Sequence, residues 1–378
     1  MRFESISSLI ALSLLSVSTF GQDTTKVADS TKVLDEFVVR GYAYDRPLNE
    51  VPAAVGIVRK TDLERFSNNS LVPVMNTIPG VRMEERSPGS YRFSVRGSLL
   101  RSPFGVRNVK VYWNGLPLTD GGGNTYLNLF DFDAVTSAEV IKGPGGSLYG
   151  AGTGGVLLLR NSGAVHPSLS VSGVFGSYGN QRYRLQYEDG NENARVTVRY
   201  VHHESDGYRE QTRMRRDALN ADVATKLDER NTLSASVFYT DLYYGTPGGL
   251  TKAQYDENPQ QARPPRTSPP VQPGAVQANA AVSNKTGYVG VTHDIDWDSQ
   301  WTSTTGLYGS LTAFENPTIR NYESRDETNV GIRHQTQYAL PGRLKGKITM
   351  GAEYQYFFSP VKVSANDGGS PGSSAVRR

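Results

Sequence analysis

The sequence predicts an α+β domain followed by an antiparallel transmembrane β-barrel. Three features of the 378 residues indicate this fold class. An apolar stretch lies at residues 6–17, short apolar runs and many glycines fill residues 51–161, and polar and apolar residues alternate from Ser168 onward. No other apolar run approaches the roughly 20 residues that a membrane helix needs, so we expect any membrane crossing to use strands.

The first 21 residues have the layout of a signal peptide. Arg2 precedes the apolar stretch, and small residues follow it around Thr19 and Gly21. Glu4 weakens the positive start, and a buried helix is the alternative interpretation. We therefore expect the chain to be exported through a signal peptide at residues 1–21.

Composition excludes several classes of function. The chain has no cysteine, which rules out disulfides, thiolate metal sites and cysteine nucleophiles. A net charge of +3 gives no strong attraction to nucleic acid. The 21 tyrosines, against 13 phenylalanines and 3 tryptophans, suit strands near a membrane interface.

A polar stretch that contains one apolar island follows the signal. We expect residues 22–43 to be flexible, and the island VLDEFVV occupies residues 33–39 within them. Phe37, Val38 and Val39 favour a short strand that has no partner nearby. Composition equally allows the alternative that the island is the first strand of the next domain.

Residues 44–163 predict the small α+β domain. Thr61 and Ser70 are N-cap residues for two short helices, and Pro79-Gly80 ends the second. A strand at residues 109–113 leads into the hairpin turn Asn114-Gly115, because both residues tolerate positive φ. A further strand at residues 139–141 leads into the run GPGGSLYGAGTGG at residues 143–155.

The glycine run contains G-x-G-x-x-G in Gly150, Gly152 and Gly155, a spacing that also occurs in dinucleotide-binding turns. Such a turn needs a following helix and an acidic residue about twenty positions later. Here residues 156–159 are a short apolar run that predicts a strand, and residues 172–177 contain no acid. We expect these glycines to permit positive φ and close chain approach, with Tyr149 packed beside them.

Nine strands are predicted from Ser168 onward. In the strands at 181–188, 194–203 and 344–358 the apolar faces carry no charge. Lipid contact explains this, because a charge at mid-membrane costs about 2–4 kcal/mol. The nine strands cover approximately residues 168–176, 181–188, 194–203, 216–227, 231–241, 284–294, 300–313, 327–339 and 344–358.

The connections between these strands alternate in length. Short and longer connections alternate along the chain. The short ones are at residues 188–193, 228–231, 295–299 and 340–343, and the longer ones are at 204–215, 242–283 and 313–326. The first hairpin, at 176–180, is also short. Outer-membrane barrels have this asymmetry, whereas a soluble β-sandwich, the alternative for alternating strands, has no reason for it. The proline-rich loop at 242–283 is long enough to be functional or disordered.

An odd number of strands leaves an open sheet edge. Unpaired backbone groups at such an edge cannot face lipid, because each costs several kcal/mol. We therefore expect residues 168–378 to be the N-terminal part of a barrel, in a fragment of a longer protein or an incomplete gene product.

Four local patterns resemble the plug domain of TonB-dependent outer-membrane receptors. In order they are Ile78-Pro79-Gly80-Val81, Val95-Arg96-Gly97, the hairpin at 111–117, and EVIKGPGGSLYGAGTGGVLLLRN from Glu139. The resemblance is close over residues 33–163 and rests on barrel architecture beyond them. Asn114 stands where the family usually has aspartate and Lys142 where arginine is commoner, and both keep the turn and the positive charge.

The resemblance implies a barrel of about 22 strands around the plug, in the outer membrane. The island then corresponds to a TonB box, in which Asp35, Glu36, Phe37, Val38 and Val39 add as a strand to the periplasmic TonB protein. The implied activity is import of an iron-siderophore complex, with cobalamin or another metal chelate as the alternative. No enzyme activity, cofactor, resident metal or nucleic-acid partner is implied, and a structural or adhesin barrel is the rival class.

The resemblance also implies roles for individual plug residues. Arg96 is expected to pair with acids of the barrel wall, and a solvated strand arginine is the alternative. Candidate ligand contacts are Arg86, Tyr91, Arg101, Phe104 and Arg107, which suit an anionic chelate but also fit ordinary loop positions. His202 and His203 point to opposite strand faces and so cannot share a metal. The residues expected to serve plug structure or gating are Pro79, Gly80, Arg96, Gly97, Gly115, Glu139, Gly143, Pro144, Tyr149, Gly150, Gly154 and Gly155.

Overall fold

The computed structural model describes residues 38–39, 46–48, 51–66, 70–87, 90–98, 106–150, 152–161, 163, 165–342 and 346–375. The expected signal peptide and residues Asp35, Glu36 and Phe37 of the box lie outside the described residues. Within these ranges no helix is long and apolar enough to cross a membrane.

A five-stranded mixed sheet forms the centre of the plug. Its strand order is β3-β8-β9-β6-β7, with β6 and β9 parallel and the other pairs antiparallel. The sequence places apolar residues at most positions of its long strands, and three of these strands, β6, β8 and β9, are buried at most positions. The strands are β3 (Val55–Arg59), β6 (Val109–Trp113), β7 (Leu116–Pro117), β8 (Ser137–Lys142) and β9 (Gly155–Arg160).

Short helices and one hairpin complete the plug, which confirms the predicted α+β class. The hairpin pairs β4 (Val81–Ser87) with β5 (Ser90–Val95). The second predicted helix is shorter than its apolar pattern suggests, and Ser70 accepts a hydrogen bond from Val72 N at 3.2 Å near its start. The helices are α1 (Lys60–Leu63), α2 (Val72–Met75) and the 3-10 turns η2 (Leu127–Leu129), η3 (Phe132–Ala134) and η4 (Gly146–Leu148).

The glycine run connects β8 to β9 without a helix of more than one 3-10 turn. Gly143, Gly150 and Gly155 have φ values of 102°, 66° and 144°, which L-residues rarely adopt. A Cβ at Gly155 would also collide with the carbonyl oxygen of Ile141. The run is therefore a strand-to-strand turn, and the dinucleotide-binding alternative is excluded by the strand that follows it.

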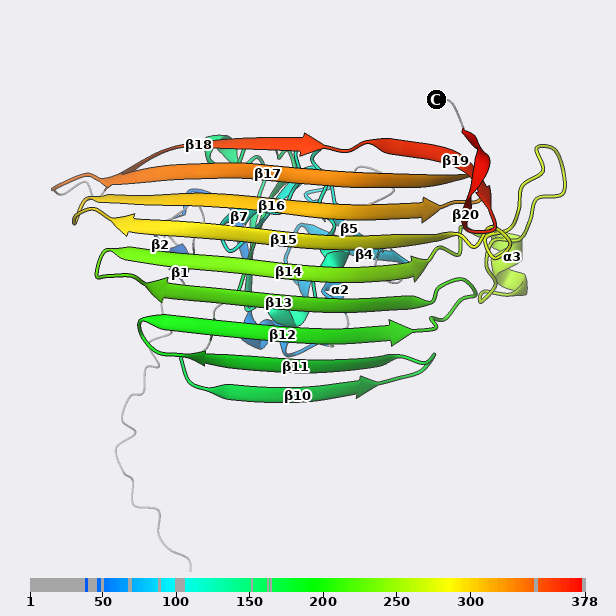
Figure 1. Ribbon diagram of the computed structural model, residues 1–378, viewed down its shortest axis with the longest axis horizontal. Helices are drawn as coiled ribbons and strands as arrows, with labels where there is room; N and C mark the ends of the chain where they lie inside the picture. The colour runs from blue at the N-terminus through cyan, green and yellow to red at the C-terminus, as the bar shows by residue number, and fades with distance from the viewer. Residues whose placement is uncertain are drawn as a thin grey trace, which may run out of the picture. The chain divides into compact units, whose positions relative to one another are not determined.

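Eleven antiparallel strands form a second sheet, which we call the wall (Figure 1). The nine predicted strands correspond to β10 through β18, each paired with its neighbour in sequence. Their bounds are β10 (Ser168–Phe175), β11 (Gln181–Gly190), β12 (Ala194–Ser205), β13 (Met214–Lys226), β14 (Asn231–Gly245), β15 (Ala281–Asp296), β16 (Trp301–Pro317), β17 (Asn321–Ala339) and β18 (Lys347–Phe358).

Two predictions about the wall are wrong. The connection expected at residues 313–326 is only residues 318–320, because β16 and β17 continue pairing past their apolar segments. The predicted number of strands is also too low, because beyond the nine predicted strands the chain forms β19 (Val361–Asp367) and β20 (Ser370–Ala375). Strand β19 pairs with the first residues of β17 beyond the end of β18, and β20 pairs with β19.

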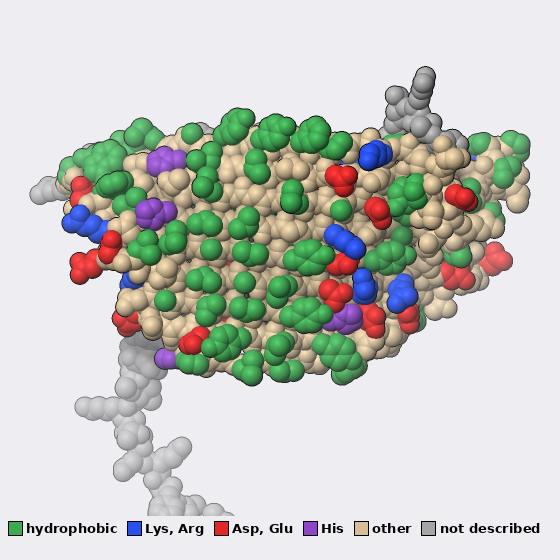
Figure 2. All heavy atoms as spheres, in the orientation of Figure 1, with side chains coloured by type: hydrophobic (Ala, Val, Ile, Leu, Met, Phe, Trp, Pro, Cys, Tyr) green, Lys and Arg blue, Asp and Glu red, His purple; other side chains and the backbone are tan. Residues whose placement is uncertain are grey.

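The two faces of the wall differ in polarity, as the alternation predicts. On the outer face, which points away from the plug, Leu219, Tyr239, Leu307 and Met350 are exposed. Figure 2 shows such apolar side chains spread over the middle of the strands, with charged groups toward the strand ends. On the inner face polar residues such as Thr240 and Asn284 are buried.

The plug packs against the inner face of the wall through a shared core. Phe238 and Tyr288 of the wall belong to the same apolar cluster as the plug residues Trp113 and Phe130. The rings of Phe130 and Phe238 meet edge to face with centroids 4.9 Å apart, and Phe238 stacks on Tyr288 at 5.0 Å. Apolar burial therefore holds the plug to the wall, in addition to polar contacts.

The apolar island is described only at Val38 and Val39. These residues form β1 (Val38–Val39), which pairs antiparallel with β2 (Arg46–Pro47). The expectation of an unpaired segment is therefore wrong for these two residues, whose partners lie nine and seven positions along the chain. The pair lies outside the five-stranded plug sheet, so Val38 and Val39 are not the first strand of that sheet either.

The long connection between β14 and β15 has structure of its own. It contains helix α3 (Lys252–Glu257), whose N-cap Thr251 accepts a hydrogen bond from Gln254 N at 3.3 Å. A small cluster of buried alanines, Ala262, Ala275, Ala278 and Ala280, packs the rest. The disordered alternative for this loop is therefore wrong.

Candidate functional site: the contact between plug and wall

A buried carboxylate of the plug binds two arginines of the wall. Asp131 precedes η3, and its side chain accepts Asp133 N at 3.1 Å, which fixes the carboxylate at the start of that turn. Arg182 on β11 donates to Asp131 Oδ1 at 2.7 Å, and Arg216 on β13 donates to Asp131 Oδ2 at 3.0 Å. All three side chains are at most 3 % exposed.

The same arginines make further contacts with the plug. Arg182 also binds Asp133 at 2.6 Å, and Arg216 donates to the carbonyl oxygens of Asn128 and Phe130 at 3.3 and 3.0 Å. Burial alone raises the pKa of Asp131, but Arg216 and Arg182 outweigh burial and hold that pKa below its ordinary value. The carboxylate is therefore ionised, and it joins the plug to two different wall strands.

A second, partly buried cluster joins β6 of the plug to β17 and β18 of the wall. Glu353 accepts Lys110 Nζ of the plug at 2.5 Å through one oxygen, and Arg333 of the wall at 2.7 Å through the other. Arg333 also donates to Tyr112 Oη at 3.1 Å and to the carbonyl oxygen of Leu148 at 3.0 Å. The rings of Tyr112 and Tyr149 meet edge to face at 5.3 Å, so the expected packing of Tyr149 beside the glycines is observed.

The plug hairpin between β6 and β7 contacts a second wall carboxylate, Asp222. Asn114 Nδ2 donates to Asp222 Oδ1 and to Ser236 Oγ, each at 2.9 Å, and Asn161 Nδ2 donates to Asp222 Oδ2 at 2.8 Å. An aspartate at position 114, the usual residue of the family, would place a second carboxylate against Asp222. The asparagine therefore fits this wall, because its amide supplies the donor that the carboxylate needs.

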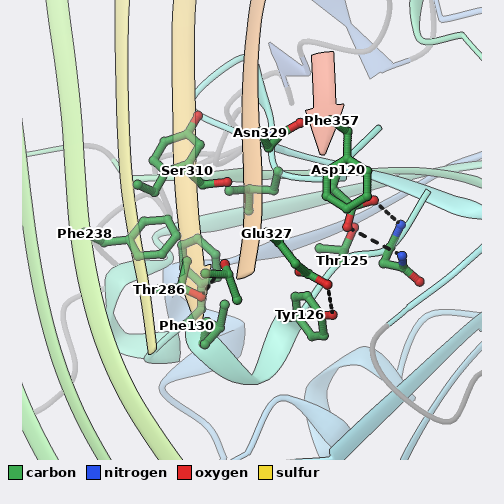
Figure 3. Close-up of a pocket in the computed structure, with 15 residues that line it drawn as sticks. Asp120, Thr125, Tyr126, Phe130, Phe238, Thr286, Ser310, Glu327, Asn329 and Phe357 are labelled. Carbon is green, nitrogen blue, oxygen red and sulfur yellow. Dashed lines mark hydrogen bonds between the residues drawn. The ribbon is translucent and has the colours of Figure 1, made fainter. Parts of the chain in front are cut away.

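A small cavity of about 40 Å³ separates the plug from the wall at the ends of the strands that lead into the long connections (Figure 3). At the edge of the cavity Tyr126 of the plug donates a hydrogen bond to Glu327 Oε1 of the wall at 3.3 Å, and Arg325 binds the same oxygen at 3.1 Å. Asp120 accepts Asn124 N at 2.9 Å on the plug side. Burial raises the pKa of Asp120, although this hydrogen bond opposes the effect. The cavity is water-sized and lined by both apolar and polar side chains, and the Tyr126–Glu327 hydrogen bond joins its plug and wall sides.

The candidate ligand contacts differ in their exposure to solvent. Arg86 is exposed near the end of β4, and Arg107 is exposed with its Nε 2.6 Å from Asn124 Oδ1. Tyr91 is buried edge to face against Phe132, and this burial raises its pKa, so the resting structure leaves its ring little surface for the predicted ligand contact. Arg101 and Phe104 lie outside the described residues.

Arg96 does not have the environment expected of a lock. Its φ of 52° and its backbone N–H, which donates to Gly80 O at 2.7 Å, place it in a tight turn with an exposed side chain. In the part of the chain that the structure describes, its guanidinium forms no ion pair with the wall. The expected lock pairs a plug arginine with wall acids, whereas the observed ion pairs at Asp131 join a plug acid to wall arginines.

The remaining plug-motif residues are structural. Gly80, Gly97 and Gly115 have φ values between 77° and 87°, and a Cβ at Gly154 would collide with Ser98. Glu139 is buried beside Arg160 at 3.3 Å, while Pro79 and Pro144 are exposed in turns. His202 bonds Asp217 and the buried His203 faces the plug side, so the two rings point to opposite faces as expected.

The sequence pattern singled out Asn114 but not the charged residues that join plug to wall. Asp131, Lys110, Arg182, Arg216 and Glu353 each belong to no motif. Their only signal is that the three wall residues occupy inward positions of alternating strands, where a charge needs a partner or water. Which plug residue supplies that partner follows only from the fold.

Comparisons with known proteins agree with this geometry. Residues 47–156 match the TonB-dependent receptor plug domain. The vitamin B12 transporter BtuB of Vibrio vulnificus is 28 % identical over 124 residues, which are 33 % of this chain and 20 % of that protein.

Solved structures match most of the chain. They include FpvA of P. aeruginosa bound to heterologous pyoverdines, with a TM-score of 0.69 and 14 % identity over 87 % of this chain and 45 % of that one. They also include the ferric citrate transporter FecA, with a TM-score of 0.68 and 19 % identity over 86 % of this chain and 51 % of that one. The chain thus spans about half the length of these receptors.

The described fold, a plug domain packed against antiparallel barrel-type strands, is similar to the folds of FpvA and FecA. Residues 47–156 are identified as a TonB-dependent receptor plug domain.

Proposed function

We propose that this chain is part of a TonB-dependent importer of a metal chelate in the outer membrane, with an iron-siderophore complex as its ligand. The proposal includes export through a signal peptide at residues 1–21 and a plug at residues 44–163. It also takes residues 168–378 as the N-terminal part of the barrel. Relatives named as transporters or receptors, not as enzymes, support a transport role.

The polar contact between plug and wall is the observation that carries the proposal. Transport needs a plug that stays in place at rest and moves under force. Ion pairs at Asp131 and Glu353 and the shared aromatic core hold the plug to the wall without covalent bonds. Breaking such pairs is costly, so plug movement requires an energy source, and TonB is that source in this proposal.

The box gives TonB its point of attachment. In the proposal Asp35, Glu36, Phe37, Val38 and Val39 add as a strand to TonB in the periplasm, with main-chain hydrogen bonds that supply affinity. The pairing of Val38 and Val39 with Arg46 and Pro47 supports this view, because it demonstrates that the segment accepts a strand partner. TonB would then replace residues 46–47 as that partner.

Deletion of residues 35–39 from the full-length protein tests the transport mechanism. Uptake of radioactive ligand should stop while binding of ligand to the cell surface persists. Uptake at the unmodified rate would refute the role of the box. Heat-modifiable migration in the outer-membrane fraction is the expected control for correct assembly, and recovery as a soluble monomer would refute the receptor assignment.

Cobalamin is the second candidate ligand, favoured by the match to a vitamin B12 transporter. Growth of cells with and without the complete gene, on ferric siderophores as sole iron source or on cobalamin as sole source of that vitamin, distinguishes the two. If growth depends on the gene only when cobalamin is the nutrient tested, cobalamin replaces the iron-siderophore complex as the proposed ligand.

A further inference from the structure

The inner face of β11, β12 and β13 carries more positive charge than the plug neutralises. Arg182, Arg184, Arg199 and Arg216 of these strands are close enough to two plug acids, Asp131 and Asp133, to be attracted by one or both of them. Arg182 and Arg216 take the close contacts to these acids. The other two arginines, Arg184 and Arg199, are therefore left with weak compensation or none.

Arg199 is the more deeply buried of the two. Its side chain is 2 % exposed, and its Nε donates to Gln186 Oε1 at 2.8 Å. Within the described residues its Nη1 has no hydrogen-bond partner, and no carboxylate lies within ion-pair distance. A buried guanidinium with no anion in direct contact is costly, since it loses its hydration while Asp131, Asp133 and Asp222 attract it only from beyond ion-pair distance.

Arg184 has a similar deficit. Its one ion pair is with Asp133 at 3.5 Å, and that carboxylate oxygen already binds Arg182 at 2.6 Å. In the described part of the chain its buried Nε also lacks a partner. Two neighbouring arginines therefore each present a free N–H donor.

Both arginines line the same cavity. It has a volume of about 260 Å³ and lies between the first plug helices and strands β11 and β12, with Ser70, Gln186 and Lys60 also on its walls. Three acids line it too, but none neutralises Arg199. Asp133 is held by Arg182, Glu64 is 60 % exposed beside Lys60, and Glu188 is partly exposed.

We propose that this cavity is a binding site for a small oxyanion, a carboxylate or phosphate group held between Arg184 and Arg199. Oxyanions accept charge-assisted hydrogen bonds from arginine, and the free N–H groups of these two side chains supply the donors. The anion has two possible sources, a free small anion or an anionic group of the transported chelate. The site does not depend on the proposed import function, because binding to the resting protein is measured without transport.

The test is equilibrium binding to the purified full-length protein in detergent micelles. Inorganic phosphate, citrate and ferric citrate are titrated in separate calorimetric experiments. Arg199→Gln and Arg184→Gln should each lower the affinity for the anion at least tenfold, because each removes a charged hydrogen-bond donor. Arg215→Gln is the matched control, since Arg215 lies on the neighbouring β13, is 45 % exposed and binds Asp241; it should bind as the unmodified protein does.

The outcomes separate the two sources and can overturn the site. Binding of phosphate or citrate alone that depends on Arg199 identifies a free anion. If ferric citrate binds in an Arg199-dependent manner while phosphate and citrate do not bind, the anion is a group of the transported chelate. Absence of binding, or equal binding by the unmodified protein and both cavity variants, overturns the proposal. Folding of each variant is checked by heat-modifiable migration, and Arg199→Gln is expected to fold because it removes an uncompensated buried charge.

Discussion

The ion pairs at Asp131 allow a quantitative prediction about how firmly the plug is held. Asp131→Asn keeps the shape of the side chain but removes its charge from between Arg182 and Arg216. Removal of one partner from a buried ion pair costs about 3–5 kcal/mol. Arg182 keeps Asp133 at 2.6 Å and Arg216 keeps two carbonyl oxygens, so we expect the lower end, about 3 kcal/mol.

Hydrogen exchange measures this loss directly. At about 1.4 kcal/mol for each factor of ten, the amides of residues 126–136 should exchange on the order of 100-fold faster in the variant than in the unmodified full-length protein. Asp189→Asn is the matched control, because Asp189 lies on β11 and bonds Tyr187 on the outer face. Its exchange pattern should be unchanged.

The pH dependence has a defined sign. The pKa of Asp131 is lower in the folded protein than its ordinary value of 3.8, so the carboxylate stabilises the docked plug above that value. This contribution is lost as pH falls from 3.8 through the lower pKa of the folded state. Unchanged exchange at residues 126–136 in Asp131→Asn at pH 7, or equal acid sensitivity of both proteins, would refute the role of these ion pairs.

Three further predictions concern other contacts of the plug. Glu353→Gln should destabilise the plug by about 3 kcal/mol, since Lys110 and Arg333 lose a shared carboxylate, and exchange at residues 109–113 should accelerate. Gly155→Ala should lower the yield of folded protein in heat-modifiability assays. The φ of 144° is unfavourable for alanine and its Cβ would collide with Ile141 O, and we expect a cost of about 1–3 kcal/mol. Asn114→Asp should cost about 1–3 kcal/mol through the lost donor to Asp222 and lower the melting temperature at pH 7.

Each of these has its own control. Glu323→Gln removes a carboxylate that pairs with Arg325 and touches no plug residue by ion pair, so residues 109–113 should exchange normally. Gly249→Ala adds a Cβ that meets nothing within 4 Å and should fold in full yield. Asn114→Ala loses the amide without adding a charge. A melting temperature for Asn114→Asp at or above that of Asn114→Ala would contradict repulsion by Asp222.

Local features of this protein were predictable because they depend on neighbouring residues. Period-two alternation places every second side chain on one face, so the nine long strands and their outer apolar surface followed from the sequence. The glycine turns followed because φ preferences belong to single residues. The strand ends at 313–326 did not, because main-chain pairing of β16 with β17 continues where side chains are polar.

Tertiary structure alone decided which charges meet. Asp131 and Arg182 are 51 positions apart, and Lys110 and Glu353 are 243 positions apart, so no local pattern relates them. The same is true of the uncompensated Arg199, which looks like an ordinary inward strand residue until the plug covers it. Sequence thus determined the class, the strands and the turns, whereas the contacts that hold the plug arise from long-range packing in which burial makes each unpaired charge costly.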